Sequence, residues 1–334
     1  MKKERRLYFL NTLNIILNIA LSFLLVVGIM PKAISYFRKL KFGQVEREEG
    51  LESHKSKGGT PTMGGIVFIL CSILTIYALN FSFITNPYIN LITFSLLSYG
   101  LIGFLDDYLI IVKKTNDGLS PKQKYGLQSI VAILFFVLAK FFIPDFSSVI
   151  TIPLINFELD LMWIYPVFVY FMFTATTNAV NLTDGLDGLA TGLSIFAIVP
   201  FAVFAIINKN YEVATYCFVI IAALFGFLCF NKHPAKIFMG DTGSLALGAT
   251  LASIAIITSN EITFIVLAGV FIVETLTCII QMVGLMVFHK KIFLMAPLHH
   301  HFEKMGYKET DIVKSFWVVG VILSMAAIAF GVWL

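Results

Sequence analysis

Long apolar runs recur from one end of the chain to the other, and short polar stretches separate them. A helix that crosses the ~30 Å hydrocarbon core needs about 20 mostly apolar residues, because lipid offers no hydrogen-bond partner to exposed backbone groups. Ten runs meet this requirement or come close to it: 9–30, 63–80, 88–112, 124–143, 161–180, 189–207, 211–230, 243–258, 262–288 and 313–334. The pattern predicts an all-α integral membrane protein with a single domain over residues 1–334.

Two of these runs need a closer interpretation. The ninth run, 262–288, is too long for one straight span, and Gly284 offers a place where it can bend. We therefore expect a long, broken ninth helix. The first run follows the basic segment Met1–Arg6 and could imitate a signal peptide, but it is too long and lacks a small-residue cleavage site. It is expected to be a retained span.

Composition supports the membrane interpretation. Hydrophobic residues make up 58% of the chain and charged residues 13%, against about 25% charged residues in soluble domains. These values disfavour a soluble enzyme and a disordered chain. The net charge of +4 does not indicate nucleic-acid binding, because the basic residues form short clusters between apolar runs. The four cysteines lie inside apolar stretches without a CxxC pair, so neither a disulfide framework nor a zinc site is expected.

Basic residues mark one face of the predicted bundle. The loops after spans 1, 3, 7 and 9, together with Lys124 at the first position of span 4 and Lys314 at the start of span 10, hold 18 of the 24 Lys and Arg residues. Cytoplasmic loops carry an excess of Lys and Arg, so the odd-numbered loops are predicted to be cytoplasmic and both termini periplasmic. The basic N-terminal tail favours the opposite orientation but holds fewer charges.

The stretches richest in polar side chains also follow the odd-numbered spans. Each stretch rich in polar side chains comes after an odd-numbered span, namely 55–62, 106–122, 181–187, 231–244 and 297–303. The loops predicted for the other face are short or chemically bland. One site at the cytoplasmic face is the simplest interpretation.

Asp106 and Asp107 close the third span in the segment GFLDDYLIIVKK. Ionisable residues at a hydrocarbon boundary are costly and are therefore functional candidates. Neighbours on a helix point about 100° apart, so the two carboxylates are expected to divide two tasks. One would face a metal or a phosphate, and the other a proton or a Lys. The alternative is a solvated helix end.

A second polar motif is NAVNLTDGLDGLATG, which contains Asn181, Asp184 and Asp187. The three-residue spacing predicts that all three share one face of a helix. Helix capping is the alternative, since Asn and Asp are common N-cap residues. Three polar residues exceed what one cap requires, which favours a ligand-facing cluster.

Asp241 precedes the eighth span in FNKHPAKIFMGDTGS, inside a turn of small residues that opens onto a helix. Backbone N–H groups at such a helix start can bind phosphate. A carboxylate beside an anion site is understandable if Mg²⁺ bridges the two, because Mg²⁺ binds through one or two carboxylates plus substrate phosphates. The alternative is that Asp241 simply caps its own helix.

Three consecutive histidines, His299, His300 and His301, occur in APLHHHFE. Their side chains diverge on any regular backbone, so they are a poor zinc site. At least one is expected to donate to a phosphate or to move a proton near neutral pH. A solvated loop is the alternative.

Two further features leave alternatives open. Several lysines beside the polar stretches could bind a diphosphate, although membrane anchoring alone explains most of them: Lys55, Lys57, Lys113, Lys114 and Lys122. Glu274 lies deep in the ninth span and needs a partner inside the bundle. A structural hydrogen bond and a role in the site are equally compatible with the sequence.

These parts fit a phosphoryl-transfer enzyme that acts on a lipid phosphate at the inner membrane surface. The motifs that carry this interpretation are KGGTPTMGG (57–65), LDDYL (105–109), NAVNLTDGLDGLA (178–190), MGDTGS (239–244) and PLHHHFE (297–303). At these motifs the sequence resembles the polyprenyl-phosphate N-acetylhexosamine-1-phosphate transferases, and most closely the bacterial branch whose substrate is phospho-MurNAc-pentapeptide.

The resemblance implies a ten-helix protein of the bacterial inner membrane with periplasmic termini, and a homodimer. It implies transfer of phospho-MurNAc-pentapeptide from UDP-MurNAc-pentapeptide to undecaprenyl phosphate, which forms lipid I and releases UMP with Mg²⁺ as cofactor. The family's catalytic acids match Asp106, Asp107 and Asp241, with Asp241 as the metal ligand, and its histidine motif matches His299–His301. Its uridine pocket matches Lys57, Asn181, Asp184, Asn231 and Phe238, with Asp187 on the same motif.

Ile110 and Ile111 stand where relatives often carry Lys, so the resemblance leaves open which Lys contacts the diphosphate; Lys114 and Lys122 are candidates. A relative that uses UDP-GlcNAc is the first alternative function, and PLHHHFE argues against it. The second is a cation or proton transporter. A transporter is expected to carry ionisable residues near mid-membrane in several spans, whereas here Glu274 is almost alone.

Overall fold

The computed structural model describes residues 2–40, 58–113, 118–144, 146–155 and 157–333, and most of them are helical. The α-helices are α1 (Lys2–Lys39), α3 (Gly65–Leu79), α4 (Pro87–Lys113), α5 (Pro121–Phe142), α6 (Tyr165–Thr183), α7 (Leu189–Ile207), α8 (Tyr211–Asn231), α9 (Gly240–Ile257), α10 (Glu261–Leu267), α11 (Gly269–Val287), α12 (Leu298–Lys304) and α13 (Glu309–Trp333). Short 3-10 turns are η1 (Phe81–Thr85), η2 (Pro153–Ile155) and η3 (Met162–Ile164).

The helices agree with the predicted membrane architecture. Among the described residues, eight helices are long and apolar enough to cross a bilayer: α1, α4, α5, α7, α8, α9, α11 and α13. The apolar helix α3 has only 15 residues. Helix α6 coincides with the fifth predicted run, but polar residues fill its second half, TATTNAVNLT. The class of a multi-pass helical membrane protein is therefore confirmed.

A small antiparallel ribbon interrupts the helical pattern between α5 and α6. It consists of β1 (Val149–Ile152) and β2 (Phe157–Asp160), with Val149 opposite Asp160 and Ile152 opposite Phe157. The hydrophobic runs did not predict it, because each strand has only four residues.

The ninth predicted run is broken, as expected, but at a different residue. The interruption is at Ala268, between α10 and α11, whereas Gly284 lies inside the regular helix α11. The prediction that Gly284 provides the bend was therefore wrong. Gly284 instead allows the following loop to approach, because a methyl group there would lie 2.8 Å from the side chain of Ile292.

Helix α9 forms the centre of the bundle. Of the 18 residues of α9, 83% are buried, compared with 22% of an apolar 18-residue stretch in each of the peripheral helices α1 and α5. Its sequence, GDTGSLALGATLASIAII, is rich in small residues, which allow neighbouring helices to approach closely inside a membrane. The first turn of α9 carries Asp241, so the most enclosed helix of the protein positions that carboxylate.

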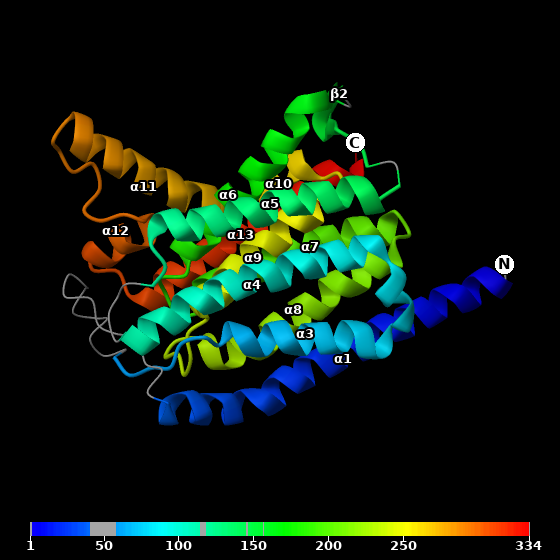
Figure 1. Ribbon diagram of the computed structural model, residues 1–334, viewed down its shortest axis with the longest axis horizontal. Coiled ribbons are helices and arrows are strands. Elements are labelled where there is room, and N and C mark those ends of the chain that lie inside the picture. Colours follow the sequence, from blue (N-terminus) through cyan, green and yellow to red (C-terminus); the bar gives the residue numbers. More distant parts are fainter. Residues whose placement is uncertain (1, 41–57, 114–117, 145, 156, 334) are drawn as a thin grey trace.

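The chain termini and the polar loops lie at opposite ends of the bundle. Both termini are at the right of Figure 1, whereas α12 and the ends of α1, α4 and α8 are at the left. Helix α11 diverges from the other helices at this left end, and α12 lies between it and the bundle (Figure 1). Backbone bonds connect distant segments there: Phe238 donates to Pro61 O at 2.8 Å, and Gly64 donates to Phe238 O at 2.9 Å.

Candidate active site

Asp107 caps a helix that begins more than a hundred residues later in the chain. Its carboxylate accepts hydrogen bonds from Asp241 N at 3.1 Å, from Thr242 N at 3.0 Å and from Thr242 Oγ1 at 2.6 Å. The first N–H groups of a helix have no intrahelical partner and favour a negative charge. Asp107 therefore fixes the start of α9 and the position of Asp241. The alternative that Asp241 caps its own helix was wrong, because Asp107 supplies the cap.

The residue before Asp241 makes this arrangement possible. Gly240 has a φ of +73°, a conformation that residues with a side chain rarely adopt. A methyl group on Gly240 would also lie 2.5 Å from Asp107 Oδ2. Only glycine therefore allows the α4 carboxylate to reach the backbone of α9.

The Asp241 side chain lies among polar groups from two other helices. Asn181 Nδ2, from α6, donates to Asp241 Oδ1 at 2.8 Å and to Ser244 Oγ at 2.9 Å. Lys124 Nζ, from α5, pairs with Asp241 Oδ2. The Asp241 side chain is 25% exposed, compared with 8% for Asp106, so Asp241 is the more accessible of these two acids.

Lys124 connects Asp241 to the first acid of the motif. Its Nζ lies 3.9 Å from Asp106 Oδ1, which also accepts a bond from Leu119 N at 3.0 Å. The two neighbouring aspartates thus have different partners, Lys124 for Asp106 and the α9 backbone for Asp107. We name the set Asp106, Asp107, Lys124, Asn181 and Asp241 the acid cluster.

Lys124 was not among the lysines singled out from the sequence. A detectable signal existed, because Ser120 and Gln123 form a reciprocal capping box with Pro121 between them. This box places Lys124 in the first turn of α5, where the helix dipole disfavours a positive charge. A basic residue at that position indicates a nearby acid. By contrast, Lys122 is exposed, and Lys57 and Lys114 lie outside the described residues.

The second polar motif does not continue as a helix. Helix α6 ends at Thr183 and α7 begins at Leu189, with Asp184 as the C-terminal cap of α6. The predicted common helical face of Asn181, Asp184 and Asp187 was therefore wrong. The reason is the glycine-rich turn between the helices, in which Gly188 has a φ of +78°.

Asp187 points to a different partner from Asn181. Its Oδ2 accepts a bond from Ala235 N at 3.0 Å and lies 3.1 Å from His233 Nδ1. The Asp187 backbone N–H donates to Glu309 Oε1 at 2.7 Å, and His233 Nδ1 lies 3.4 Å from Glu309 Oε2. This network joins the α6–α7 turn to the loop after α8 and to the start of α13.

Asn231 and Phe238 hold the two ends of the loop after α8. Asn231 is buried; it accepts a bond from Thr191 Oγ1 at 2.7 Å and donates to Ile237 O at 3.1 Å. The backbone of Phe238 is bonded to the segment before α3, and its ring is partly exposed. Both residues therefore shape the same end of the bundle that carries the acid cluster.

The three histidines have different hydrogen-bond partners, but the prediction that their side chains diverge was wrong for His299 and His300, whose ring centroids lie 4.1 Å apart. His299 Nδ1 lies 3.0 Å from Glu274 Oε2, and His300 Nδ1 lies 2.6 Å from Glu303 Oε2. His301 Nδ1 accepts a bond from Leu294 N at 3.1 Å. Glu274 thus has the partner inside the bundle that its depth in the ninth span required.

The acid cluster fits a divalent cation. Carboxylate oxygens of Asp106 and Asp241 already face one positive charge, the Lys124 ammonium, and hard oxygen donors suit Mg²⁺ or Ca²⁺. A second group, Asp187, His233 and Glu309, places one ligand atom of each residue within 4.8 Å of the others. His233 Nδ1 also lies within 3.4 Å of carboxylate oxygens of Asp187 and Glu309, so this geometry is compatible with a hydrogen-bond network and with a metal site.

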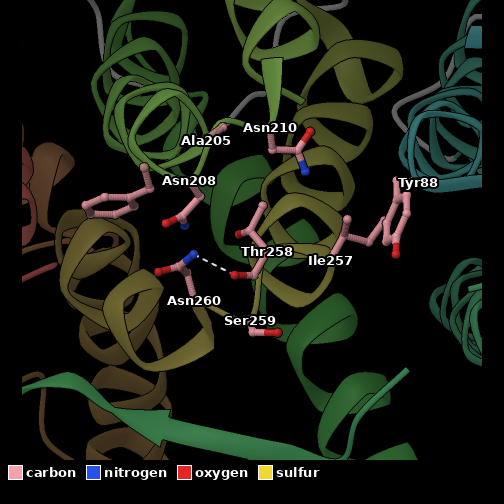
Figure 2. A pocket seen from close by; sticks show the side chains of 9 residues that line it. Tyr88, Ala205, Asn208, Asn210, Ile257, Thr258, Ser259 and Asn260 are labelled. Atoms are coloured by element: carbon pink, nitrogen blue, oxygen red, sulfur yellow. Dashed lines mark hydrogen bonds between the residues drawn. The ribbon is translucent and has the colours of Figure 1, made fainter. Parts of the chain in front are cut away.

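A pocket at the other end of the bundle contains none of these residues. Its volume is about 320 Å³, and its lining includes Asn208 and Asn210 after α7 and Thr258, Ser259 and Asn260 after α9. Figure 2 shows these side chains around the opening. Because α9 begins at the acid cluster and ends at this pocket, the two lie a helix length apart.

The fold defines a polytopic helical membrane protein with an acid cluster at one end, and comparison with known proteins specifies the family. Residues 88–259 match the family described as "Glycosyl transferase family 4". The chain is 47% identical over 314 residues to the phospho-N-acetylmuramoyl-pentapeptide-transferase of Staphylococcus saprophyticus. This match covers 93% of this chain and 98% of that protein. It is 45% identical over 321 residues to the transferase of the same name from Bacillus subtilis, with 96% and 98% covered.

The chain belongs to the phospho-N-acetylmuramoyl-pentapeptide transferase family. This membership confirms the resemblance drawn from the motifs and the prediction of a transferase of bacterial cell-wall synthesis. It also decides against the UDP-GlcNAc-using relative and the transporter.

Proposed function

We propose that the chain transfers phospho-MurNAc-pentapeptide from UDP-MurNAc-pentapeptide to undecaprenyl phosphate, forming lipid I and releasing UMP, with the acid cluster as the reaction centre. One observation carries this proposal. Side chains from α4, α5, α6 and α9, which are far apart in the sequence, meet at one end of a helical membrane bundle. Family membership supplies the substrate class.

The proposed placement in the membrane follows the basic residues. The protein spans the inner membrane of a bacterium ten times, counting α3, α6 and the broken α10–α11 as spans. The acid cluster faces the cytoplasm, where the nucleotide substrate is dissolved, and both termini face the periplasm. A homodimer is proposed from the family resemblance alone.

The proposed metal ion is Mg²⁺, held by Asp241 with Asp106 beside it. When bound, it supplies positive charge that offsets the negative charge of the sugar-nucleotide diphosphate. Asn181 supports this role, because its donation to Asp241 Oδ1 fixes the orientation of the carboxylate. Lys124 can rotate from Asp241 toward the diphosphate, since its ammonium is a mobile point charge on a flexible chain.

Different roles are proposed for the two neighbouring aspartates. Both oxygens of Asp107 accept bonds from the first turn of α9, so Asp107 positions Asp241. Asp106 has one oxygen near the Lys124 ammonium, which leaves it better placed to orient or deprotonate the lipid phosphate. That phosphate attacks the sugar-linked phosphorus, and UMP leaves.

The nucleotide is proposed to lie between the acid cluster and the loop after α8. Its contacts are proposed to come from Lys57, Asn181, Asp184, Asp187, Asn231 and Phe238, with Lys114 and Lys122 near the diphosphate. His300 and His301 lie at the same end and are partly exposed, which suits them for contact with a phosphate.

A turnover assay tests the function. Full-length protein in detergent is incubated with Mg²⁺, undecaprenyl phosphate and either UDP-MurNAc-pentapeptide or UDP-GlcNAc, and released UMP is measured. Release with the pentapeptide substrate only supports the proposal. Release with UDP-GlcNAc only, or with neither substrate from well-folded protein, contradicts it.

A matched pair of variants tests the site. Asp241→Asn is expected to remove UMP release, while Asp160→Asn leaves it unchanged. Asp160 is an exposed residue of β2 at the other end of the bundle. Equal turnover in the two variants would refute the acid cluster as the reaction centre.

A further inference from the structure

Glu274 and His299 form a buried pair that the transfer chemistry above does not use. Glu274 lies in α11, and His299 lies in the first turn of α12. Their side chains are 0% and 1% exposed, and Glu274 Oε2 lies 3.0 Å from His299 Nδ1. A carboxyl group is costly to bury unless it is hydrogen-bonded, so this contact explains how α11 tolerates Glu274.

The pair has unused hydrogen-bonding capacity. Glu274 Oε1 and His299 Nε2 are buried and have no hydrogen-bond partner among the described residues. Buried polar atoms without a partner are rare in folded proteins and call for a specific explanation. The contact between Nδ1 and the carboxyl group fixes the direction of Nε2, and with an ionised Glu274 as the acceptor the proton is on Nδ1.

His299 Nε2 faces the turn between α6 and α7. A methyl group on Gly185 would overlap Nε2, so only glycine allows the ring to approach this closely. Gly185 lies between Asp184 and Asp187. The buried pair therefore holds His299 Nε2 in contact with the Asp184–Asp187 turn, where the nucleotide is proposed to bind.

We propose that Glu274 is a positioning residue for the transfer reaction and acts through His299 on the Asp184–Asp187 turn. The carboxylate fixes the orientation and tautomer of the imidazole, and Nε2 is thereby presented to the turn and to a nucleotide bound there. This inference rests on the proposed nucleotide site at that turn. Carboxylates that orient histidines in this way contribute about 10–100-fold to metal affinity or activity in metal sites.

The test separates positioning from folding by steady-state kinetics of the full-length protein. Glu274→Leu is expected to raise the KM for UDP-MurNAc-pentapeptide about 10-fold or more, with kcat and the KM for undecaprenyl phosphate nearly unchanged. Glu274→Gln is expected to stay close to wild type, because its amide oxygen can accept the same bond from Nδ1. Gly185→Ala disturbs the ring from the other side and is expected to raise the same KM.

Glu261 provides a matched control at the other end of the bundle. It is also buried, with 2% of the residue exposed, and accepts a bond from Tyr165 Oη at 2.7 Å. One of its oxygens, Oε2, also has no hydrogen-bond partner among the described residues. Glu261→Leu therefore removes an equivalent buried carboxyl group, and the nucleotide KM is expected to remain at the wild-type value.

Two results would overturn the inference. One is a wild-type nucleotide KM in Glu274→Leu or in Gly185→Ala. The other is an equal rise of that KM in Glu274→Leu and Glu261→Leu. Asp184→Asn distinguishes this failure from failure of the proposed nucleotide site. If Asp184→Asn raises the KM and Glu274→Leu does not, only the positioning inference fails; if neither raises it, the nucleotide site fails as well.

Discussion

The two ends of the helix bundle are held together in different ways. At the end opposite the acid cluster, the α7–α8 and α9–α10 turns repeat one local design. Lys209 and Ser259 adopt φ values of 56° and 53°. In each turn the following Asn donates its backbone N–H to a carbonyl five residues earlier, Asn210 to Ala205 and Asn260 to Ala255.

Long-range side-chain bonds are present at that end too, from Tyr165 to Glu261 and from Asn86 to Glu212. At the acid-cluster end, such bonds come from several helices and converge on the start of α9. Asp107 of α4 caps α9, Asn181 of α6 bonds Asp241 of α9, and Asp187 bonds the loop after α8. A turn that only reverses the chain is satisfied by its own backbone and by nearby residues. A site must hold groups from several helices at fixed distances, which requires long-range bonds. The convergence of bonds from α4, α5 and α6 on the start of α9 supports the proposal that the reaction centre lies there.

The largest expected difference between the ends concerns activity. Asp241→Asn removes the charge that is proposed to hold the metal and that pairs with Lys124, and it is expected to lower kcat roughly 10²–10³-fold or more. The measurement is UMP release by protein whose melting temperature is near that of the wild type. Asn210→Ala at the other end is the control and is expected to keep wild-type kcat. Wild-type turnover in Asp241→Asn would show that the acid-cluster end of the bundle is not the reaction centre.

Lys124 is expected to have the next largest effect. Lys124→Met deletes the only ammonium group that the structure places against Asp106 and Asp241 within the described residues, and is expected to lower kcat/KM roughly 10–100-fold. Lys140→Met is the matched control, because Lys140 is an exposed residue in the last turn of the same helix. If the Lys140 variant loses as much activity as the Lys124 variant, the assignment of Lys124 to the site is wrong.

Asp107→Asn tests how much the long-range cap of α9 contributes to the stability of the protein. An Asn side chain has one acceptor oxygen where Asp107 uses two, so the start of α9 loses charged hydrogen bonds worth about 1–2 kcal/mol. The melting temperature in detergent is expected to fall, and activity is expected to fall with it because Asp241 is displaced. Asp160→Asn controls for loss of one negative charge. An unchanged melting temperature would show that Asp107 does not cap α9 in solution.

Much of the helical arrangement could be predicted from the sequence, because the requirement to span a bilayer leaves a strong hydrophobic pattern. Each predicted run coincides with a helix or, for the ninth, with the pair α10 and α11. The exact break was missed because Ala268, a good helix former, gives no local signal. Gly284 attracted attention for its flexibility, but its small size is used for packing.

The acid cluster was predicted in part, for a similar reason. Asp106, Asp107 and Asp241 stand out because charged groups are rare in apolar surroundings. Their separate tasks depend on which helices cross, and the spacing of residues along one helix does not contain that information. Lys124 was missed because it lies among several lysines that membrane anchoring already explains. Only its place in the first turn of α5 distinguishes it.

The smallest expected effect concerns the locally capped end. Asn210 accepts a bond from Val213 N at 3.2 Å, and removing such a cap costs about 1 kcal/mol. Asn210→Ala is therefore expected to lower the melting temperature slightly, less than Asp107→Asn does, and to leave the KM values for both substrates unchanged. Thermal melting and steady-state kinetics on the same preparation measure both quantities. A loss of activity larger than the loss of stability would mean that this end also contributes to the reaction, and the contrast between the two ends would then not separate structure from chemistry.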